Sequence, residues 1–459
     1  MTYDLLAPAM FASLVVVLLA GFPVAFSLAA VAGMFGILGI ITHHFDAVFL
    51  TAITFRIEGF FENDNLLAIP LLVFMGMLLE RTGLAEDMLL ALNGLFGQIT
   101  GGLAYTVIIV GAVLSAITGF VSASVMALGL ISLPVMLRLD YNHRFAAGVV
   151  AAAGTLAQIL PPSLVLIVLA EQLDVSLIDV YRGALAPSGL LIALYFTYVF
   201  FATRWKPELA PAAATRENIA AKFRGWTQTV IAAGLPFGLV LAVLASIYFG
   251  IAAPSEGGAI GVTGTLLLGL ARRRLTVHNL KQALDIAGIL CSCVIFLLLG
   301  SSFFTLVFRG LNGHVWIESL FQLVPAGQLG FLVFVNLGIF FLAFFLDFFE
   351  VAFIVLPLIA PIAHKSGIDM VWLTVLLAVN LQTSFMHPPF GIALYNLRSV
   401  APRSVATVDI YWGAAPFLLI QLLMVALLIA LPQVVTSNPT TPVNTDNIQI
   451  ELPPPLDDK

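Results

Sequence analysis

Residues 154–163 read GTLAQILPPS and lie inside an apolar segment that covers residues 146–170. The adjacent Pro161 and Pro162 remove two backbone donors and push the residue before each of them away from helical angles. In the hydrocarbon of a membrane, backbone groups freed in this way are tolerated only where they meet protein, water or an ion. The stretch therefore predicts a membrane helix that is broken near the middle of the bilayer.

The same device returns 227 residues later in the chain. Pro388 and Pro389 interrupt a second apolar segment, residues 371–397. A further pair of similar stretches, DVYRGA at 179–184 and DIYWGA at 409–414, is offset by 230 residues. Corresponding broken segments in two halves of a chain are the best sequence indication of a transporter's binding site.

Composition indicates a polytopic membrane protein. The chain has 459 residues, of which 61% are hydrophobic and 10% charged, whereas a soluble domain carries about a quarter charged residues. The net charge of −6 gives no indication of nucleic-acid binding, because the few charges lie in predicted loops. Cys291 and Cys293 are spaced for neither a disulfide nor a structural zinc site. The first apolar run has no basic region before it, so we interpret it as a retained span.

We predict an all-α polytopic membrane fold built from two inverted-topology repeats. Each repeat has about five spans, a re-entrant helical hairpin and a Pro-Pro-broken helix. The predicted units are a first repeat (1–203), a basic cytoplasmic linker (204–225), a second repeat (226–433) and a disordered, acidic, Pro-rich tail (434–459). Their predicted parts are an interfacial amphipathic segment (43–65), hairpins (103–137 and 328–362) and broken helices (146–170 and 371–397).

The basic residues predict an orientation. If the linker and the loop around residues 272–281 are cytoplasmic, most of the 19 Lys and Arg residues lie inside, as the positive-inside rule expects. The first repeat then starts outside and the second inside. The basic residues left outside are Arg56, Arg182, Arg309, Lys365 and Lys459.

The polar groups near both breaks are weakly charged oxygen ligands. Ser and Thr hydroxyls, the Asn380 amide and freed carbonyls suit a monovalent cation such as Na⁺ better than a soft metal. Helix N-termini at the breaks would offer amides to an anionic substrate. The alternative is that the small polar residues only allow close helix packing. Asp347 and Glu350 either bind a cation or proton at membrane depth or face water at a hairpin tip; His387 either titrates near neutral pH or is structural.

Other function classes find less support. The chain has no nucleotide-binding loop, no paired Cys or His metal motif, no hydrolase elbow and no soluble segment that would hold an ATPase. A membrane-embedded enzyme would need more convergent polar groups than one Asp, one Glu and one His. A channel stays open as an alternative, because broken helices also line pores. We therefore expect a non-enzyme without cofactors, driven by an ion gradient if transport is uphill.

With these residues in place, the chain resembles the large membrane subunit of TRAP (tripartite ATP-independent periplasmic) transporters, the DctM-like subunit. The resemblance runs from the first span to about Leu431. The stretches that carry it are LAIPLLVFMG (67–76), Glu80 with TGLAED (82–87), residues 148–163 and residues 380–391.

The resemblance implies an elevator-type, Na⁺-coupled uptake system in the bacterial inner membrane. Its substrate would be a small organic acid anion, such as a C4-dicarboxylate. Its partners would be a small four-span membrane subunit and a periplasmic substrate-binding protein. Residues 43–65 look like an insertion and the tail like an addition, and either could dock one of these partners. A stand-alone ion-coupled symporter without a binding protein is the alternative.

The resemblance also implies where cations bind, at the hairpin tips and the unwound segments. The implied Na⁺ positions are Ser115, Gly119, Ser122, Ser124, Gly154, Thr155, Pro161, Asp347, Asn380, Thr383, Ser384 and Pro388. Ser163, Glu350 and His387 are candidates for the substrate region. The chain departs from the family pattern at Phe348, where we would expect proline after Asp347, and at His387. These departures leave the choice between Na⁺ and H⁺ open.

Overall fold

The computed structural model describes residues 5–96, 99–211, 226–321, 327–343, 346, 348–388 and 391–436. Within those ranges the regular structure is helical, and no strand occurs. Six helices are long and apolar enough to cross a membrane, or up to seven if α3 and α4, which are bent by 53°, form one span. The polytopic all-α class predicted from the sequence is thereby confirmed. Asp347, the linker beyond residue 211 and the tail beyond residue 436 lie outside the described residues.

The first half of the chain runs from a helical pair, through an α3–α4 corner, to a hairpin and a broken helix. Its helices are α1 (Leu6–Leu19), α2 (Val24–Ile41), α3 (Ala52–Glu62), α4 (Asp64–Arg81), α5 (Leu84–Phe96), α6 (Gly102–Thr118), α7 (Val121–Arg138), α8 (His143–Thr155), α9 (Leu164–Gln172) and α10 (Leu177–Trp205). Single turns of 3₁₀ helix occur at η1 (Ala47–Thr51), η2 (Leu156–Gln158) and η3 (Pro207–Leu209).

The second half runs in the same order. Its helices are α11 (Trp226–Tyr248), α12 (Pro254–Ala271), α13 (Val277–Gly310), α14 (Gly313–Phe321), α15 (Gly327–Leu342), α16 (Phe348–Glu350), α17 (Leu356–Lys365), α18 (Met370–Ser384), α19 (Ile392–Val400), α20 (Thr407–Ala430) and α21 (Gln433–Thr436). A π-helical turn, η5 (Val351–Val355), joins α16 to α17.

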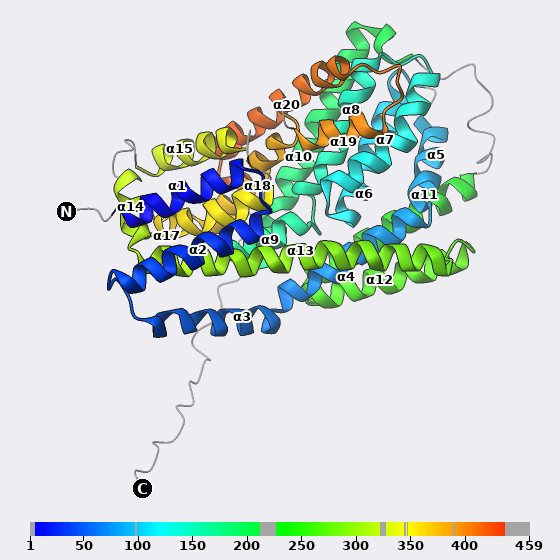
Figure 1. Cartoon of the computed structure of the whole chain (residues 1–459). Helices are drawn as coiled ribbons and strands as arrows, with labels where there is room; N and C mark the ends of the chain where they lie inside the picture. The colour runs from blue at the N-terminus through cyan, green and yellow to red at the C-terminus, as the bar shows by residue number, and fades with distance from the viewer. Residues whose placement is uncertain are drawn as a thin grey trace.

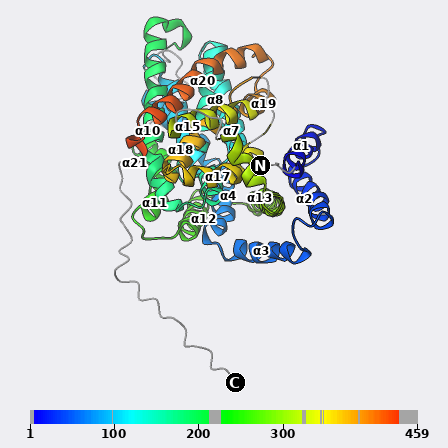
Figure 2. The same cartoon turned by 90° about the vertical axis from the view of Figure 1, so that its left-hand side faces the viewer.

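Long helices frame one side of the molecule. The 34 residues of α13 make a rod of about 50 Å at 1.5 Å per residue, longer than the hydrocarbon core of a bilayer. Helix α2 packs along α13, α12 packs along α4, and α13 crosses α4 (Figure 1). In the view turned by 90°, α1, α2 and α3 form an outer layer beside α13 (Figure 2). Helices α8, α9 and α18, which flank the two breaks, are mostly buried.

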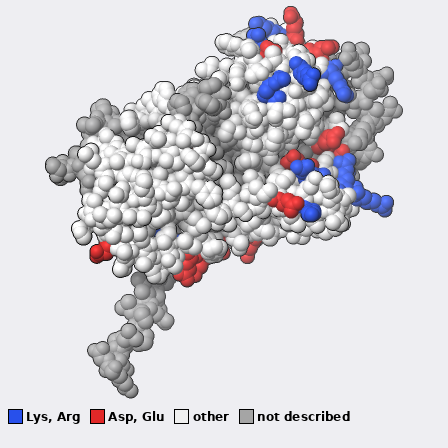
Figure 3. Space-filling model, in the orientation of Figure 1, with Lys and Arg blue, Asp and Glu red and all other residues white. Residues whose placement is uncertain are grey.

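The outer surface matches a lipid environment. Large apolar side chains such as Phe26, Phe200, Phe296 and Leu419 are exposed on four different helices, as expected where lipid replaces water as the solvent. On the face shown in Figure 3, Lys and Arg side chains gather at the end of the molecule where Figure 1 labels α5, α7 and α8, and the opposite end is almost free of them. This asymmetry is the one on which the predicted orientation rests.

Two pairs of helices approach closely through glycine. A Cβ added to Gly148 of α8 would lie 2.0 Å from the carbonyl oxygen of Gly413 in α20, and one added to Gly413 would lie 2.0 Å from the carbonyl oxygen of Arg144. Only glycine allows two helix backbones to pack at such distances. Gly183 of α10 faces side chains of α18 instead, because methyl groups of Val371 and Val375 lie 3.0 and 3.6 Å from the position of an added Cβ.

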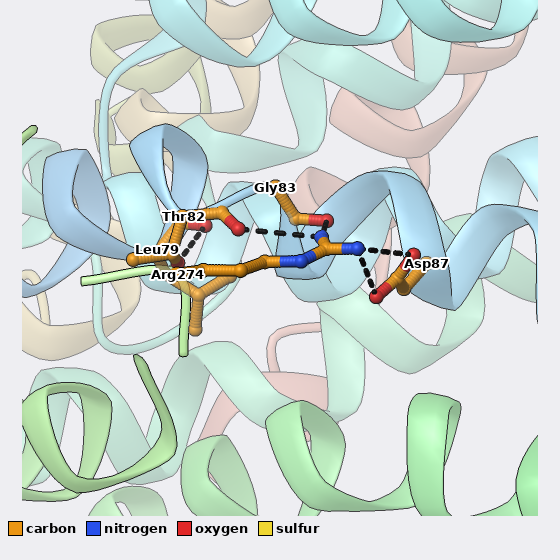
Figure 4. Close-up of polar contacts among 5 residues, drawn as sticks. All are labelled: Leu79, Thr82, Gly83, Asp87 and Arg274. Carbon is orange, nitrogen blue, oxygen red and sulfur yellow. Dashed lines mark hydrogen bonds and ion pairs between the residues drawn. The ribbon is translucent and has the colours of Figure 1, made fainter. Parts of the chain in front are cut away.

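An arginine clamp holds the α4–α5 corner to the α12–α13 loop (Figure 4). One Nη of Arg274 donates to the carbonyl oxygens of Gly83 at 2.9 Å and Thr82 at 3.4 Å, at the end of α4. The other Nη lies 3.0 Å from a carboxylate oxygen of Asp87 on α5. A cation is favourable at a helix C-terminus, where carbonyl groups lack intrahelical partners.

Replacing Arg274 with alanine is expected to destabilise the protein by about 2 kcal/mol. The Asp87 side chain is 7% exposed and the Arg274 side chain 35%, so the loss should lie between the values for surface pairs and fully buried pairs. Thermal unfolding of the purified protein in detergent would measure it. Arg273→Ala, at an exposed neighbouring position, is the matched control; equal melting temperatures for the two variants would contradict the clamp.

Candidate functional site

The first broken helix satisfies its freed backbone with hydroxyl groups. Helix α8 gives way to η2, and α9 starts only after Ser163. The Ser163 hydroxyl donates to the carbonyl of Ala157 at 2.6 Å and accepts from the amide of Val165 at 3.1 Å, which caps α9. The Ser188 hydroxyl on α10 donates to the carbonyl of Ile159 at 3.0 Å. Ser163, a predicted substrate-region residue, therefore holds the break together.

The second break begins before its proline pair. Helix α18 continues through Ser384, so Asn380, Thr383 and Ser384 are helical. The hydroxyls of Thr383 and Ser384 donate to carbonyls three residues back, at 2.6 and 2.5 Å. The backbone leaves the helix at Phe385 and re-enters one at Ile392. Pro388 is exposed between the two helices.

The tip of the first hairpin lies against the first break. Helix α6 ends at Gly119, which has a left-handed φ of 58°, and α7 begins two residues later. A Cβ on Gly119 would lie 2.9 Å from the backbone nitrogen of Leu164, at the start of α9. The hydroxyls of Thr118 and Ser124 are 2.6 Å apart and close the tip. The tip of the first hairpin and the start of α9 are therefore in direct backbone contact, at Gly119 and Leu164.

Two more predicted positions join the first hairpin to α8. The Ser115 hydroxyl on α6 donates to the carbonyls of Ala153 and Gly154, at 3.2 and 3.3 Å. A Cβ on Gly154 would lie 2.4 Å from a methyl group of Val125 on α7. Ser115, Gly119, Ser124, Gly154 and Thr155 thus lie together around the tip and the end of α8.

The second hairpin is tied to α18 through asparagine. The Asn380 amide donates to the carbonyl of Asn336 on α15 at 2.8 Å. His387 is buried, and its ring centroid lies 5.2 Å from that of Phe340 on α15. Glu350 is half-buried on α16. Asp347, the first candidate for a cation-binding carboxylate, is outside the described residues.

Thr155 lies at the centre of a buried polar cluster. Gln382 of α18 and Gln421 of α20 each donate from Nε2 to the Thr155 hydroxyl oxygen at 3.3 Å. Gln421 Nε2 also lies 2.9 Å from the hydroxyl of Tyr195 on α10. The Oε1 atoms of Gln382 and Gln421 are buried and accept no hydrogen bond within the described part of the chain. Two amide oxygens are therefore available beside one hydroxyl.

A cavity of about 110 Å³ opens where the two hairpins and the two breaks converge. The first turns of α7, α9 and α19 line it, through residues such as Val121, Leu164 and Ile392. The N-cap of α7 provides no side-chain hydrogen bond, so first-turn amides stay available there. In α19 the amides of Ala393 and Leu394 already donate to the carbonyls of Phe385 and Gly391. Each N-terminus carries a partial positive charge of about half a unit. The cavity therefore favours an anion.

The remaining walls are mostly aromatic. Phe120, Phe348, Phe349 and Phe385 line the cavity, together with Ser122. The other polar wall is Gln158, the last residue of η2. No Lys or Arg is among the described residues that line it.

The geometry can be compared with known proteins. The family model described as "Tripartite ATP-independent periplasmic transporter, DctM component" matches residues 11–434. The chain belongs to the DctM family. Members of this family are transporter permeases of the inner membrane. This chain is a multi-pass inner-membrane protein of that family. The resemblance inferred from the sequence is thus confirmed.

Individual relatives are distant but extensive. The C4-dicarboxylate TRAP transporter large permease protein DctM of Pseudomonas aeruginosa is 27% identical over 376 residues, covering 81% of this chain and 86% of that protein. The sialic acid TRAP transporter permease protein SiaT of Haemophilus influenzae is 25% identical over 394 residues; the match covers 85% of this chain but 62% of SiaT. The crystal structure of the Alcanivorax borkumensis YdaH transporter is similar in fold, with a TM-score of 0.58, 16% identity and coverage of 94% of this chain and 98% of that chain.

Not every residue of the candidate site was identified from the sequence. Gln158, Gln382, Gln421 and Tyr195 were not singled out, although uncharged amides in apolar segments are costly unless they have partners or a function. A search for every glutamine inside a predicted span would have found three of the four. Of the predicted cation positions that the structure describes, only Ser122 lines the cavity.

Proposed function

We propose that this protein is the translocation subunit of a secondary-active TRAP transporter that takes up a small organic acid anion, driven by a Na⁺ gradient. The observation that carries the proposal is the cavity at the meeting of both hairpins and both breaks, ringed by helix N-terminal turns. The free amides at the start of α7, together with the positive ends of the three helices, would bind a carboxylate without a cationic side chain and still allow its release.

We further propose that the halves are inverted repeats that move as an elevator. Matching helices exchange partners: α2 packs on α13 while α12 packs on α4, and α8 packs on α20 while α18 packs on α10. The contact of Gly413 with Gly148 has a counterpart in that of Gly183 with Val375, at offsets of 230 and 227 residues. This reciprocity is what a pseudo-two-fold axis requires, and it supports the plan. The α2–α4 and α12–α13 helices would then form the frame against which the hairpin region slides.

Sodium is the coupling ion that the polar cluster suits best. Gln382 Oε1 and Gln421 Oε1 are buried, neutral oxygen ligands that accept no hydrogen bond among the described residues. The Thr155 hydroxyl holds both amides in place by accepting from their Nε2 atoms. A hard monovalent cation prefers such ligands. The hydroxyls of Ser115, which bonds to the end of α8, and of Ser124, at the hairpin tip, would add ligands from the first half. Asp347, Glu350 and His387 remain the candidates for H⁺ coupling.

Sodium is expected to raise the melting temperature of the purified protein when NaCl replaces choline chloride at equal ionic strength. A ligand that binds only the folded form stabilises it by about 2.7 kcal/mol at a hundredfold excess over its Kd. Thr155→Val keeps the shape but removes the hydroxyl, so it should abolish most of the Na⁺-dependent rise. Unfolding followed by tryptophan fluorescence would measure both.

The control is Thr197→Val, an exposed threonine on α10 whose hydroxyl bonds only to its own helix. It should leave the Na⁺ effect intact. If Na⁺ has no effect on the unsubstituted protein, the coupling ion is not Na⁺, and the same experiment across pH would test H⁺. If Thr155→Val keeps the full effect, the cation site lies elsewhere.

The partners follow from the family. We propose that the protein works with a small membrane subunit and with a periplasmic binding protein that delivers the anion. The family's name, which describes a tripartite periplasmic transporter, supports this assembly. Uptake that requires a binding protein distinguishes this assembly from a stand-alone symporter. Accumulation of the anion against its concentration gradient distinguishes the TRAP assembly and the stand-alone symporter from a channel, which can only equilibrate its solute. Relatives named for C4-dicarboxylate and for sialic acid support an organic acid anion without fixing which one.

A further inference from the structure

We propose that Gln158 makes the cavity selective for a monocarboxylate that has a compact apolar body and one hydroxyl group next to the carboxylate. The inference deepens the proposed function and rests on it, because it assumes that the cavity holds the transported anion. It concerns which anion is chosen, which the family does not settle.

Gln158 is the most exceptional side chain in the cavity. It is fully buried, with 0% of its surface exposed. Neither its Nε2 nor its Oε1 has a hydrogen-bond partner within the described part of the chain. A buried amide without partners is costly, and more than nine in ten buried polar groups in proteins have a partner. Its position on the cavity wall indicates that the missing partner is the ligand.

The surroundings decide what that ligand is. One carboxylate can be held by the uncapped first turn of α7. A second carboxylate would face the four phenylalanines, and no cationic side chain lines the cavity among the described residues. An ionised group transferred to such walls is strongly disfavoured. A dicarboxylate of the same size should therefore bind poorly, whereas an apolar body fits the aromatic walls.

The amide then selects for a hydroxyl. A carboxamide presents one donor face and one acceptor face, and a hydroxyl both accepts from Nε2 and donates to Oε1. An isosteric ligand without the hydroxyl leaves the buried amide unpaired. Sites built to bond a polar group reject analogues that lack it more strongly than apolar sites reject small changes in size.

The test compares three anions of similar size on the purified full-length protein in constant NaCl: 2-hydroxyisovalerate, isovalerate and succinate. Their Kd values would come from the ligand dependence of thermal unfolding. We expect 2-hydroxyisovalerate to bind roughly tenfold more tightly than isovalerate, the effect of one buried hydrogen bond. Succinate should bind at least about tenfold more weakly than 2-hydroxyisovalerate.

The variant Gln158→Leu should remove the preference for the hydroxyl and leave isovalerate binding equal or tighter. Its unliganded melting temperature should not fall, because a buried amide without partners is replaced by an apolar group of similar size. Gln172→Leu is the matched control: the same change, on α9 and outside the cavity, should preserve the ranking. A purely structural role for Gln158 would lower stability without changing the ranking.

The outcomes separate the two proposals. If succinate binds the unsubstituted protein as tightly as 2-hydroxyisovalerate, or if the ranking survives in Gln158→Leu, the selectivity inference is overturned and anion transport stands. If none of the three anions changes the melting temperature and Na⁺ does not either, both proposals fail. The wild-type comparison needs no variant, so it decides even if Gln158→Leu does not fold.

Discussion

Gly148→Ala is expected to destabilise the protein by about 3 kcal/mol, at the upper end for overpacking substitutions. The added methyl would lie 2.0 Å from the carbonyl oxygen and 3.1 Å from the Cα of Gly413. Both obstacles are backbone, so no side chain can rotate away, and α8 would have to separate from α20. That separation would also carry Thr155 away from Gln421. Thermal unfolding and the yield of monodisperse protein would measure the loss.

The matched control is Gly189→Ala. Gly189 is exposed in the middle of α10, and no described atom lies within 4 Å of the position its Cβ would take. Alanine there should raise stability by up to about 1 kcal/mol, because alanine is the better helix former. The same substitution is therefore expected to lower the stability of the protein at Gly148 and to raise it at Gly189. If Gly148→Ala proves neutral, the tight α8–α20 contact is wrong.

Gly119→Ala is expected to reduce substrate-dependent stabilisation and uptake at least tenfold, about 1.4 kcal/mol of binding free energy. The left-handed backbone at Gly119 disfavours a Cβ, and the Cβ would lie 2.9 Å from the backbone nitrogen of Leu164. The hairpin tip must then move off the start of α9. Because both segments line the cavity, its shape changes with them. Uptake by cells expressing the variant with its partners would measure the loss.

Gly21→Ala separates the collision from the backbone strain. Gly21 has a φ of 84°, so alanine there meets the same strain as at Gly119, but no described atom lies within 4 Å of its Cβ. We expect it to lower the melting temperature slightly while leaving uptake near the unsubstituted level. Equal losses of uptake in the two variants would show that strain alone, and not the contact with α9, explains the effect.

Much of this architecture can be predicted from the residues. Adjacent prolines force a helix to end wherever they occur, so the interruptions near Pro161 and Pro388 follow from local stereochemistry. Composition and the length of apolar runs are equally local, and they give the all-helical membrane class. The exact end of α18 does not follow from the prolines: the helix ends at Ser384, and the hydroxyls of Thr383 and Ser384 bond back onto it.

The convergence of side chains cannot be predicted in this way. Gln421 meets Thr155 across 266 residues of sequence, and nothing in either local stretch specifies the other. The contacts of Arg274 likewise depend on how the α12–α13 loop packs against the end of α4. A glutamine inside a predicted span marks Gln158 as a candidate, but only the structure shows that it is buried without partners among the described residues. These contacts depend on the tertiary packing of distant segments and not on any local sequence pattern.

The helix starts around the cavity have a consequence for how selectivity can change. The positive potential that attracts an anion comes from main-chain amides, which carry no titratable proton and cannot be removed by substituting a side chain. Attraction for an acid should therefore be insensitive to pH wherever the substrate itself stays ionised, and it should survive sequence drift. The wall side chains are then free to change which acid is chosen. A family could diversify its substrates by altering a few wall residues without having to rebuild the means of holding a carboxylate.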